Sequence, residues 1–230
     1  MAYLTSQKSL SAEAYRSLRT SIQYSSIDGE LKTIVITSSV PGEGKSTVAS
    51  NLAKSFSEMN QKVLLLDADL RKPTIHKKLN LSNQVGLSDL IVQKLPISDV
   101  IQVLGDDLHV MTAGKVPPNP AELVGSEAMT QLLTHLKEMY DYIIVDTPPL
   151  LSVTDPQLLA LKADGTLLVV RQGMARHKFV LNAYKELEKV QARVIGTVLN
   201  DIEQKSKGYS KYYYAYSESS NDKKRKKIVK

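Results

Sequence analysis

The segment from Ser38 to Thr47 combines glycines, a lysine and hydroxyl side chains in a spacing suited to phosphate chemistry. It reads SSVPGEGKST and follows the apolar run at 33–38. The two glycines allow backbone N–H groups to face phosphate oxygens. The lysine can reach β- and γ-phosphates, and the hydroxyl after it can hold Mg²⁺. We therefore expect contacts to a nucleoside triphosphate from Gly42, Glu43, Gly44, Lys45, Ser46 and Thr47.

Ser39 stands where this pattern usually has its first glycine. The alternative interpretation is an ordinary glycine turn that precedes a helix. The order of strand, loop, Gly-Lys-Ser and amphipathic helix favours the phosphate-binding loop.

Acidic residues follow two further apolar runs. VLLLDADLR contains Asp67, Asp69 and Arg71, and YIIVDTPP contains Asp146. Ligands of open α/β sheets bind outside the carboxyl ends of the strands, so these side chains are expected near the lysine loop. A carboxylate there fits a Mg²⁺ contact, direct or through water, whereas Asp146 alone could be a helix N-cap. Together the segments predict one metal–phosphate site, with Ser46, Asp67, Asp69 and Asp146 as candidate magnesium ligands.

Short apolar runs alternate with amphipathic helical patterns through residues 32–202. Such runs suit strands that are buried on both faces of a parallel sheet. The alternation predicts a doubly wound α/β fold with right-handed crossovers and helices on both faces. The expected strands span 33–38, 62–69, 108–113, 142–147, 165–170 and 193–200. The expected helices span 12–25, 47–59, 121–140 and 178–191, with a helix-containing insertion at 85–107.

Composition excludes some classes of site. The chain has 230 residues and no cysteine, so disulfides and thiolate metal sites are excluded. No apolar run approaches the roughly 20 residues needed to span a bilayer, and the N-terminus lacks a signal-peptide pattern, which together predict a soluble cytosolic protein. Residues 203–230 hold nine Lys/Arg and three Asp/Glu, so this segment accounts for the whole net charge of +6. A basic tail suits an anionic partner or simple solubility.

Five segments, in order, resemble the bacterial tyrosine kinases, which are P-loop enzymes that control capsule and exopolysaccharide synthesis. PGEGKST at 41–47, LLLDADLRKP at 64–73 and IIVDTPP at 143–149 resemble their Walker A, A′ and B boxes. EAYRSLRT at 13–20 resembles their E-x-x-R-x-x-R segment, and YSKYYYAYSESS at 209–220 resembles their tyrosine cluster. The resemblance implies a P-loop NTPase-type fold with an oligomerisation segment at 1–28, a kinase domain at 29–202 and a flexible tail at 203–230.

The resemblance also implies roles for the phosphate-site residues. Lys45 would stabilise charge on the transferring phosphoryl group, while Ser46 and Asp146 would organise Mg²⁺. The cofactors implied are ATP and Mg²⁺.

Four further residues take roles from the same resemblance. Asp67 would accept the proton of the substrate tyrosine hydroxyl or orient that hydroxyl, and Asp69 would assist the metal network. Arg71 would contact phosphate, and Asn200, at the end of the last strand, would contact adenine. Because an aspartate is a poor base for a phenol of pKa near 10, we expect orientation to matter more than basicity in this transfer.

The tail has the composition of a substrate segment. It lacks periodicity, which predicts disorder, and its only aromatic residues are tyrosines, so the phenol matters more than the bulk. A tail that stacks on nucleic acid is the alternative. The resemblance favours autophosphorylation in trans at Tyr209, Tyr212, Tyr213, Tyr214 and Tyr216.

The N-terminal segment places Glu13, Arg16 and Arg19 near one helix face. Ordinary Glu–Arg pairing on a solvated surface is one interpretation. The resemblance implies contacts that close a ring of subunits. It further implies a membrane-anchored adaptor as activator, a cognate phosphotyrosine phosphatase, polysaccharide-synthesis enzymes as substrates, no nucleic-acid partner, and recruitment to the inner face of the plasma membrane.

Two other functions share parts of this pattern. A partitioning-type P-loop ATPase would have a signature lysine at the position of Val40 and would lack the tyrosine tail. A non-catalytic nucleotide-dependent adaptor would bind ATP without forming phosphotyrosine.

Overall fold

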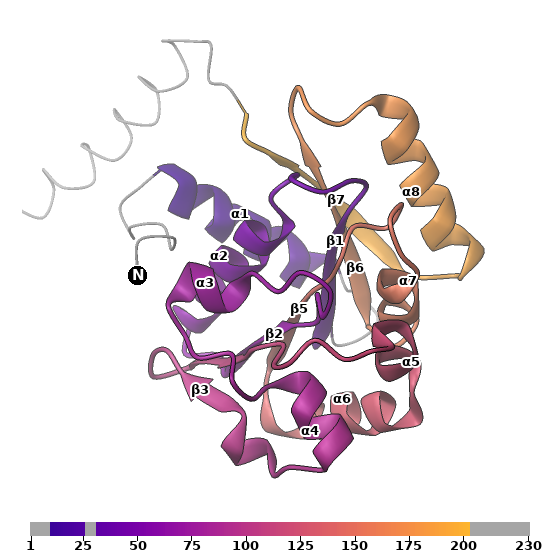
Figure 1. The fold of residues 1–230 in the computed structure, drawn as a ribbon. Coiled ribbons are helices and arrows are strands. Elements are labelled where there is room, and N and C mark those ends of the chain that lie inside the picture. The colour runs from indigo at the N-terminus through magenta and orange to yellow at the C-terminus, as the bar shows by residue number, and fades with distance from the viewer. Residues whose placement is uncertain (1–9, 26–30, 203–230) are drawn as a thin grey trace, which may run out of the picture. The chain divides into compact units, whose positions relative to one another are not determined.

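A computed structural model describes residues 10–25 and 31–202 and contains a seven-stranded sheet (Figure 1). The strand order is β3-β4-β2-β5-β1-β6-β7, and every neighbouring pair is parallel except β3 with β4. The strands are β1 (Thr33–Ser38), β2 (Val63–Asp67), β3 (Ile101–Val103), β4 (Leu108–Met111), β5 (Tyr142–Asp146), β6 (Gly165–Arg171) and β7 (Val194–Asn200). The sheet lies within the part of the chain that ends at Asn200.

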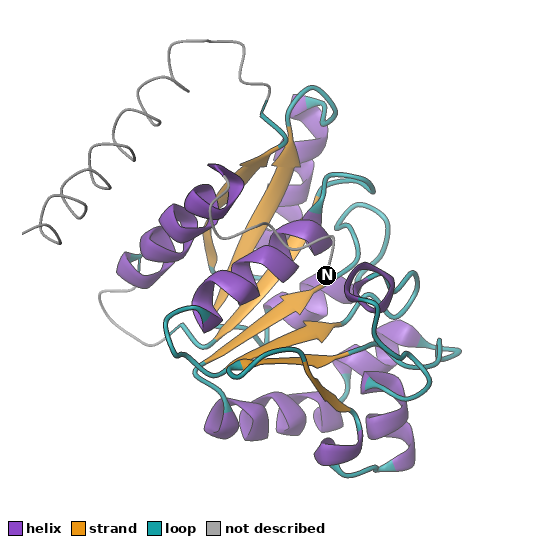
Figure 2. Ribbon diagram, turned by 90° about the vertical axis from the view of Figure 1, so that its left-hand side faces the viewer, coloured by secondary structure: helices purple, strands orange, loops and turns teal. Residues whose placement is uncertain are grey.

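Helices cover both faces of this sheet, as Figures 1 and 2 show. One face packs against α1 (Leu10–Tyr24), α2 (Lys45–Ser57) and α3 (Ile75–Leu79). The other face packs against α4 (Leu87–Gln93), α5 (Pro120–Gly125), α6 (Glu127–Met139), α7 (Asp155–Ala160) and α8 (His177–Lys189). The predicted α/β fold, with a mainly parallel sheet between two helical layers, is confirmed.

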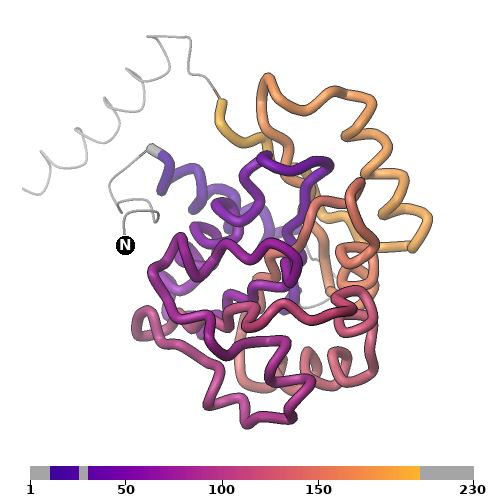
Figure 3. Tube along the Cα trace, viewed as in Figure 1, coloured from indigo at the N-terminus to yellow at the C-terminus, as the bar shows by residue number. Residues whose placement is uncertain are grey.

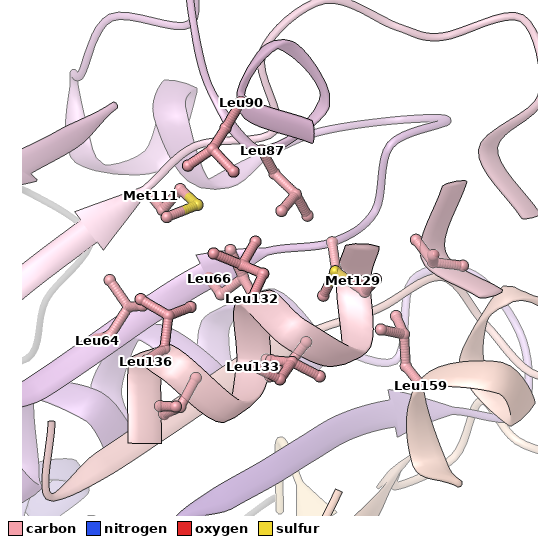
Figure 4. Close-up of a cluster of buried hydrophobic side chains, with 14 of the residues drawn as sticks. Leu64, Leu66, Leu87, Leu90, Met111, Met129, Leu132, Leu133, Leu136 and Leu159 are labelled. Carbon is pink, nitrogen blue, oxygen red and sulfur yellow. The ribbon is translucent and has the colours of Figure 1, made fainter. Parts of the chain in front are cut away.

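The core between the sheet and α6 is formed by leucines of both elements. Leu64 and Leu66 of β2 face Leu132 and Leu136 of α6, with Met111 of β4 alongside (Figure 4). The opposite face of the same strands packs on α2. The central strands are therefore buried on both sides, which explains why they are uninterrupted apolar runs rather than alternating ones.

The short helices α3 and α7 were not among the predicted elements, and two of the predicted segments differ from the structure. The single helix expected at 121–140 is two helices, because Ser126 adopts extended backbone (φ −66°, ψ 159°) and its hydroxyl accepts a hydrogen bond from the Met129 N–H. The insertion expected at 85–107 contains the helix α4 and also β3, which pairs antiparallel with β4. A strand of three residues at the sheet edge leaves too short a pattern to recognise.

Helix α1 lies along α2, and Figure 3 shows the two helices side by side in the indigo part of the chain. Ile22 of α1 is buried in the core that α2 forms with the sheet. No helix among residues 10–25 and 31–202 is long and apolar enough to cross a membrane.

Shortening Leu66 tests the core under α6. Leu66 is fully buried. Leu66→Ala therefore removes packing contacts and leaves a cavity that the surrounding structure fills only in part. It should lower the free energy of unfolding by about 3 kcal/mol. Urea denaturation measures the change. The control Val103→Ala, at a side chain that is 68% exposed, should stay within about 0.5 kcal/mol of the parent; equal effects of the two variants would contradict this packing.

Candidate nucleotide and metal site

The loop between β1 and α2 has the backbone shape of a phosphate cradle. Gly42 and Gly44 have φ of 88° and 91°, a region that side chains disfavour. Gly44 immediately precedes α2, so the loop ends at the positive end of that helix. A Cβ on Gly44 would lie 2.1 Å from Nδ2 of Asn200. Both sequence-predicted glycines are therefore required by backbone conformation, and Gly44 is also required by space.

Glu43 and Asn200 brace the loop from behind. The fully buried Glu43 carboxylate accepts hydrogen bonds from the Ser39 hydroxyl and the Val40 N–H, each at 2.8 Å. Asn200 donates its side-chain amide to the Glu43 carbonyl at 3.0 Å. Ser39, in place of the usual glycine, thus takes part in holding the loop. The Asn200 side chain is directed at the loop itself, and its expected adenine contact stays a prediction.

Lys45 lies among carboxylates at the carboxyl edge of the sheet. Its Nζ is 3.0 Å from Asp69 Oδ2 and 3.9 Å from Asp146 Oδ1. Burial alone would lower the pKa of Lys45, but the charges of Asp146 and Asp69 outweigh it and the pKa is raised. Lys45 therefore carries a firm positive charge at the point where phosphate oxygens are expected.

Asp67 lies deeper and shapes the segment after β2. Its Oδ1 accepts the Asp69 N–H at 3.2 Å, and its Oδ2 accepts the N–H groups of Thr74 and Ile75 at 3.2 and 3.1 Å. Burial, followed by the charge of Asp146, raises the pKa of Asp67 to about 8 despite these hydrogen bonds. Asp67 and Asp146 are register partners on the adjacent strands β2 and β5, so two carboxyl groups share one buried position.

Asp146 is fully buried, and neither of its carboxylate oxygens accepts a hydrogen bond within the described chain. Burial raises its pKa to about 6, while Lys45 and the nearby Ser46 hydroxyl act in the opposite direction. A buried carboxylate that accepts no hydrogen bond and lies beside a hydroxyl has the donor chemistry that Mg²⁺ prefers. The residues present therefore fit a magnesium ion that shares its ligands with phosphate.

A cleft of about 530 Å³ opens above these groups. Its lining includes Gly42, Gly44, Lys45, Ser46, Thr47, Asp69 and Arg71, which sequence analysis had assigned to the site. Glu43, Asp67, Asp146 and Asn200 lie outside the lining residues. The sequence-predicted residues thus form two layers, one facing the cleft and one supporting it.

Nine lining residues were not among the predicted site residues, and three of these nine are basic. Lys72, Lys78 and Arg171 line the cleft together with Val153. Lys78 donates from α3 to the Thr47 hydroxyl at 2.9 Å. These cations make the cleft suitable for a polyanion. The sequence gives little indication that these basic residues line a site, because lysines that follow a loop normally lie on a solvated surface.

Arg71 is paired with a buried carboxylate that the sequence analysis missed. Its Nε and Nη2 donate to Oδ2 and Oδ1 of Asp155 at 2.9 and 3.0 Å. These hydrogen bonds are the main cause of the raised pKa of Arg71. Thr-Asp-Pro at 154–156 is an ordinary helix start, so nothing in the sequence distinguishes Asp155 from a capping residue.

The N-terminal acidic and basic residues do not share one environment. Arg16 pairs with Glu13 at 2.8 Å and lies 3.7 Å from Glu58, which immediately follows α2. Arg19 is only 8% exposed and donates to the backbone carbonyl and the hydroxyl of Ser55 in α2. Arg19 therefore links α1 to α2 of the same chain by hydrogen bonds. The predicted intersubunit role of these residues stays a prediction.

The predicted autophosphorylation sites lie outside the residues that the structure describes. This holds for the whole segment at 203–230, including Tyr209, Tyr212, Tyr213, Tyr214 and Tyr216.

Comparisons with known proteins bear on the whole described fold. A family model described as "AAA domain" matches residues 31–199. Tyrosine-protein kinase YwqD of Bacillus subtilis is 42% identical over 212 residues, which cover 92% of this chain and 89% of that protein. The putative tyrosine-protein kinase CapB of Staphylococcus aureus is 37% identical over 92% of each chain. The crystal structure of the chimerical protein CapA2B2 superposes with a TM-score of 0.84 at 37% identity, covering 88% of this chain and 91% of that one.

Replacing Asp146 with asparagine tests the buried carboxyl pair through pH. The raised pKa of Asp146 means that the folded protein retains a proton that the unfolded chain releases near pH 4, so the free energy of unfolding falls as pH rises through about 6. Asp146→Asn removes this charge without breaking a hydrogen bond. The nucleotide-free variant should gain about 1.4 kcal/mol over the parent at pH 8 relative to pH 5.

Thermal unfolding between pH 5 and pH 8 measures this difference. Asp106→Asn, at an exposed aspartate, serves as the control and should leave the pH dependence unchanged. Parallel curves of thermal stability against pH for the parent and Asp146→Asn would show that the pKa of Asp146 is not raised in the folded protein.

Proposed function

Because this chain belongs to the bacterial tyrosine kinase family, we propose that it transfers the γ-phosphoryl group of ATP to tyrosine hydroxyls, including tyrosines in the tail of a neighbouring copy. The reaction forms a phosphorus–oxygen bond to the phenol and breaks the bond between the γ-phosphorus and the β–γ bridging oxygen, which leaves as part of ADP. The phenolic proton must move to an acceptor during or after this step. The family carries out this chemistry in capsule and exopolysaccharide synthesis.

The observation that carries the proposal is the position of Lys45 between the glycine loop and two carboxylates. Phosphoryl transfer in most analyses proceeds through a loose transition state, so positioning and charge stabilisation matter most. Lys45 supports the proposal because its charge is held at 3.0 Å from Asp69, at the floor of a cleft with four other basic residues. Phosphate oxygens entering this cleft would replace Asp69 as partners of the ammonium group.

Magnesium is proposed to be held by Ser46 and Asp146, with Asp69 and Asp67 supporting the metal network. When bound, Mg²⁺ would neutralise charge on the β- and γ-phosphates. The protein's own contribution is to keep the Ser46 hydroxyl and the unpartnered Asp146 carboxylate adjacent at the end of β5.

The phenolic proton is proposed to pass to the aspartate pair at the end of β2. Asp69 lines the cleft, whereas Asp67 is buried beneath it and accepts hydrogen bonds from three backbone N–H groups. This arrangement favours Asp69 as the group that contacts the tyrosine hydroxyl. It favours Asp67 as the group that fixes the position of Asp69. Arg71 would contact the transferring phosphoryl group, and Asn200 would approach adenine.

The substrate and partner assignments follow the family. We propose that the tail tyrosines reach the cleft of an adjacent copy in a ring that uses Glu13, Arg16 and Arg19. A membrane-anchored adaptor would activate the kinase and recruit it to the inner face of the plasma membrane. A cognate phosphatase would reverse the modification, and polysaccharide-synthesis enzymes would be further substrates.

Lys45→Met provides the direct test of phosphoryl transfer. The change removes the cation that stabilises phosphoryl charge, so phosphotyrosine should fall at least about 100-fold. Mass spectrometry after incubation with Mg·ATP, with the adaptor's cytosolic segment present, measures it. Lys178→Met, at an exposed lysine of α8, is the matched control and should retain full activity. ATP binding without any phosphotyrosine in the parent chain would instead support a nucleotide-dependent adaptor.

A second test replaces Tyr209, Tyr212, Tyr213, Tyr214 and Tyr216 with phenylalanine. This variant keeps the glycine loop and its carboxylates, so the ATP dissociation constant should remain within about twofold of the parent value. Its self-labelling should fall to near zero because the acceptor phenols are gone. Undiminished labelling would mean that the acceptor tyrosines lie elsewhere in the chain.

A further inference from the structure

Asp155 is a buried carboxylate that pairs with the guanidinium of Arg71, a residue that lines the cleft. The Asp155 side chain is fully buried, whereas the Arg71 side chain is 39% exposed and lines the cleft. Both carboxylate oxygens accept from the guanidinium, at 2.9 and 3.0 Å. A bidentate pair of this kind fixes the plane of the guanidinium as well as its position. The Asp155 side of the pair thus lies in the protein interior, and the Arg71 side is available to the cleft.

Asp155 is itself held by a loop that is attached to the phosphate site. The loop leaves β5 at Asp146 and reaches α7 at Asp155. Along the way the Leu150 N–H donates to the Ser38 carbonyl at 2.8 Å, and the Leu151 N–H donates to the Ser39 carbonyl at 3.2 Å. The Thr37 hydroxyl donates to the Pro148 carbonyl at 2.9 Å. The carboxylate that aims Arg71 is therefore positioned relative to the same residues that lead into the glycine loop.

We propose that Asp155 is a positioning residue for phosphoryl transfer, which holds the Arg71 guanidinium at the cleft so that it meets the charge that develops on the phosphoryl group. This inference rests on the proposed kinase function and extends it to a residue outside the three phosphate-site motifs. An arginine side chain has many rotamers, and ordering it only when substrate arrives would cost free energy in the transition state. The pair with Asp155 orders it beforehand. Arg71 keeps donors free for phosphate because only two of its five N–H groups are used by Asp155.

A merely structural ion pair makes a different prediction. It would lower stability when broken but leave the turnover of the folded enzyme unchanged. The two roles are separated by turnover measured on folded protein and by combining substitutions at both positions, since a residue that acts only through Arg71 has no effect once Arg71 is removed.

The experiment compares Asp155→Asn, Arg71→Ala and the double variant in the 230-residue chain. Initial rates of phosphotyrosine formation are measured across a range of Mg·ATP concentrations, below the melting temperature of every variant. We expect Asp155→Asn to lower kcat about tenfold with KM for ATP within about twofold, and Arg71→Ala to lower kcat about 100-fold. The double variant should be no slower than Arg71→Ala. A further tenfold loss in the double variant, or unchanged kcat in Asp155→Asn, would overturn the proposal.

Asp164→Asn is the matched control, because Asp164 forms a comparable ion pair with Lys137 at 2.7 Å and accepts the Thr33 N–H at the opposite end of β1. It should lower the melting temperature without changing kcat. If Asp155→Asn does not fold, Arg71→Lys gives the same test with Asp155 intact: loss of the bidentate pair should lower kcat about tenfold, and parental kcat would overturn the proposal. Absence of phosphotyrosine in the parent chain would refute the kinase function itself, which is a separate outcome.

Discussion

The structure depends on burying carboxyl groups next to a lysine where β2 and β5 end. Asp67 and Asp146 are register partners and both are fully buried, so their negative charges oppose one another and oppose burial. Lys45 offsets part of this cost, and backbone N–H groups offset another part. The rest of this cost is not offset, because the Asp146 carboxylate accepts no hydrogen bond within the described chain. We propose that a bound magnesium ion offsets the remaining cost.

The surrounding elements keep this charged centre in place. Glu43 and Asn200 fix the glycine loop from behind, while the loop from β5 to α7 is hydrogen bonded to β1 and ends at the partner of Arg71. Leucines under α6 hold β2 against the second helical layer (Figure 4). Two cleft-facing residues, Asp69 and Arg71, are therefore hydrogen bonded to buried carboxylates, which restricts the movement of the site before substrate binds.

The sequence predicted the features that rest on local patterns. Six parallel strands are continuous apolar runs, and Gly44, Lys45 and Asp146 are at fixed distances from them, so the sheet and the centre of the site could be inferred. Asp155 could not, because its role depends on Arg71, which is 84 residues away in the chain. Helical spacing placed Arg19 on one helix face, and the family resemblance implied an intersubunit contact, but neither reveals that Ser55 of α2 lies within hydrogen-bonding distance. Lys78 likewise reaches Thr47 only through the packing of α3 on α2.

Proton release on nucleotide binding tests the buried charge centre directly. Calorimetric titration of preformed Mg·ATP into the protein at pH 7, in buffers of different ionisation enthalpy, gives the number of protons exchanged. Asp67, with a pKa of about 8, holds a proton at pH 7 that a bound cation would displace, whereas Asp146, with a pKa of about 6, is already mostly ionised. The account predicts net release of protons to the buffer. No exchange, or net uptake of protons, would contradict it.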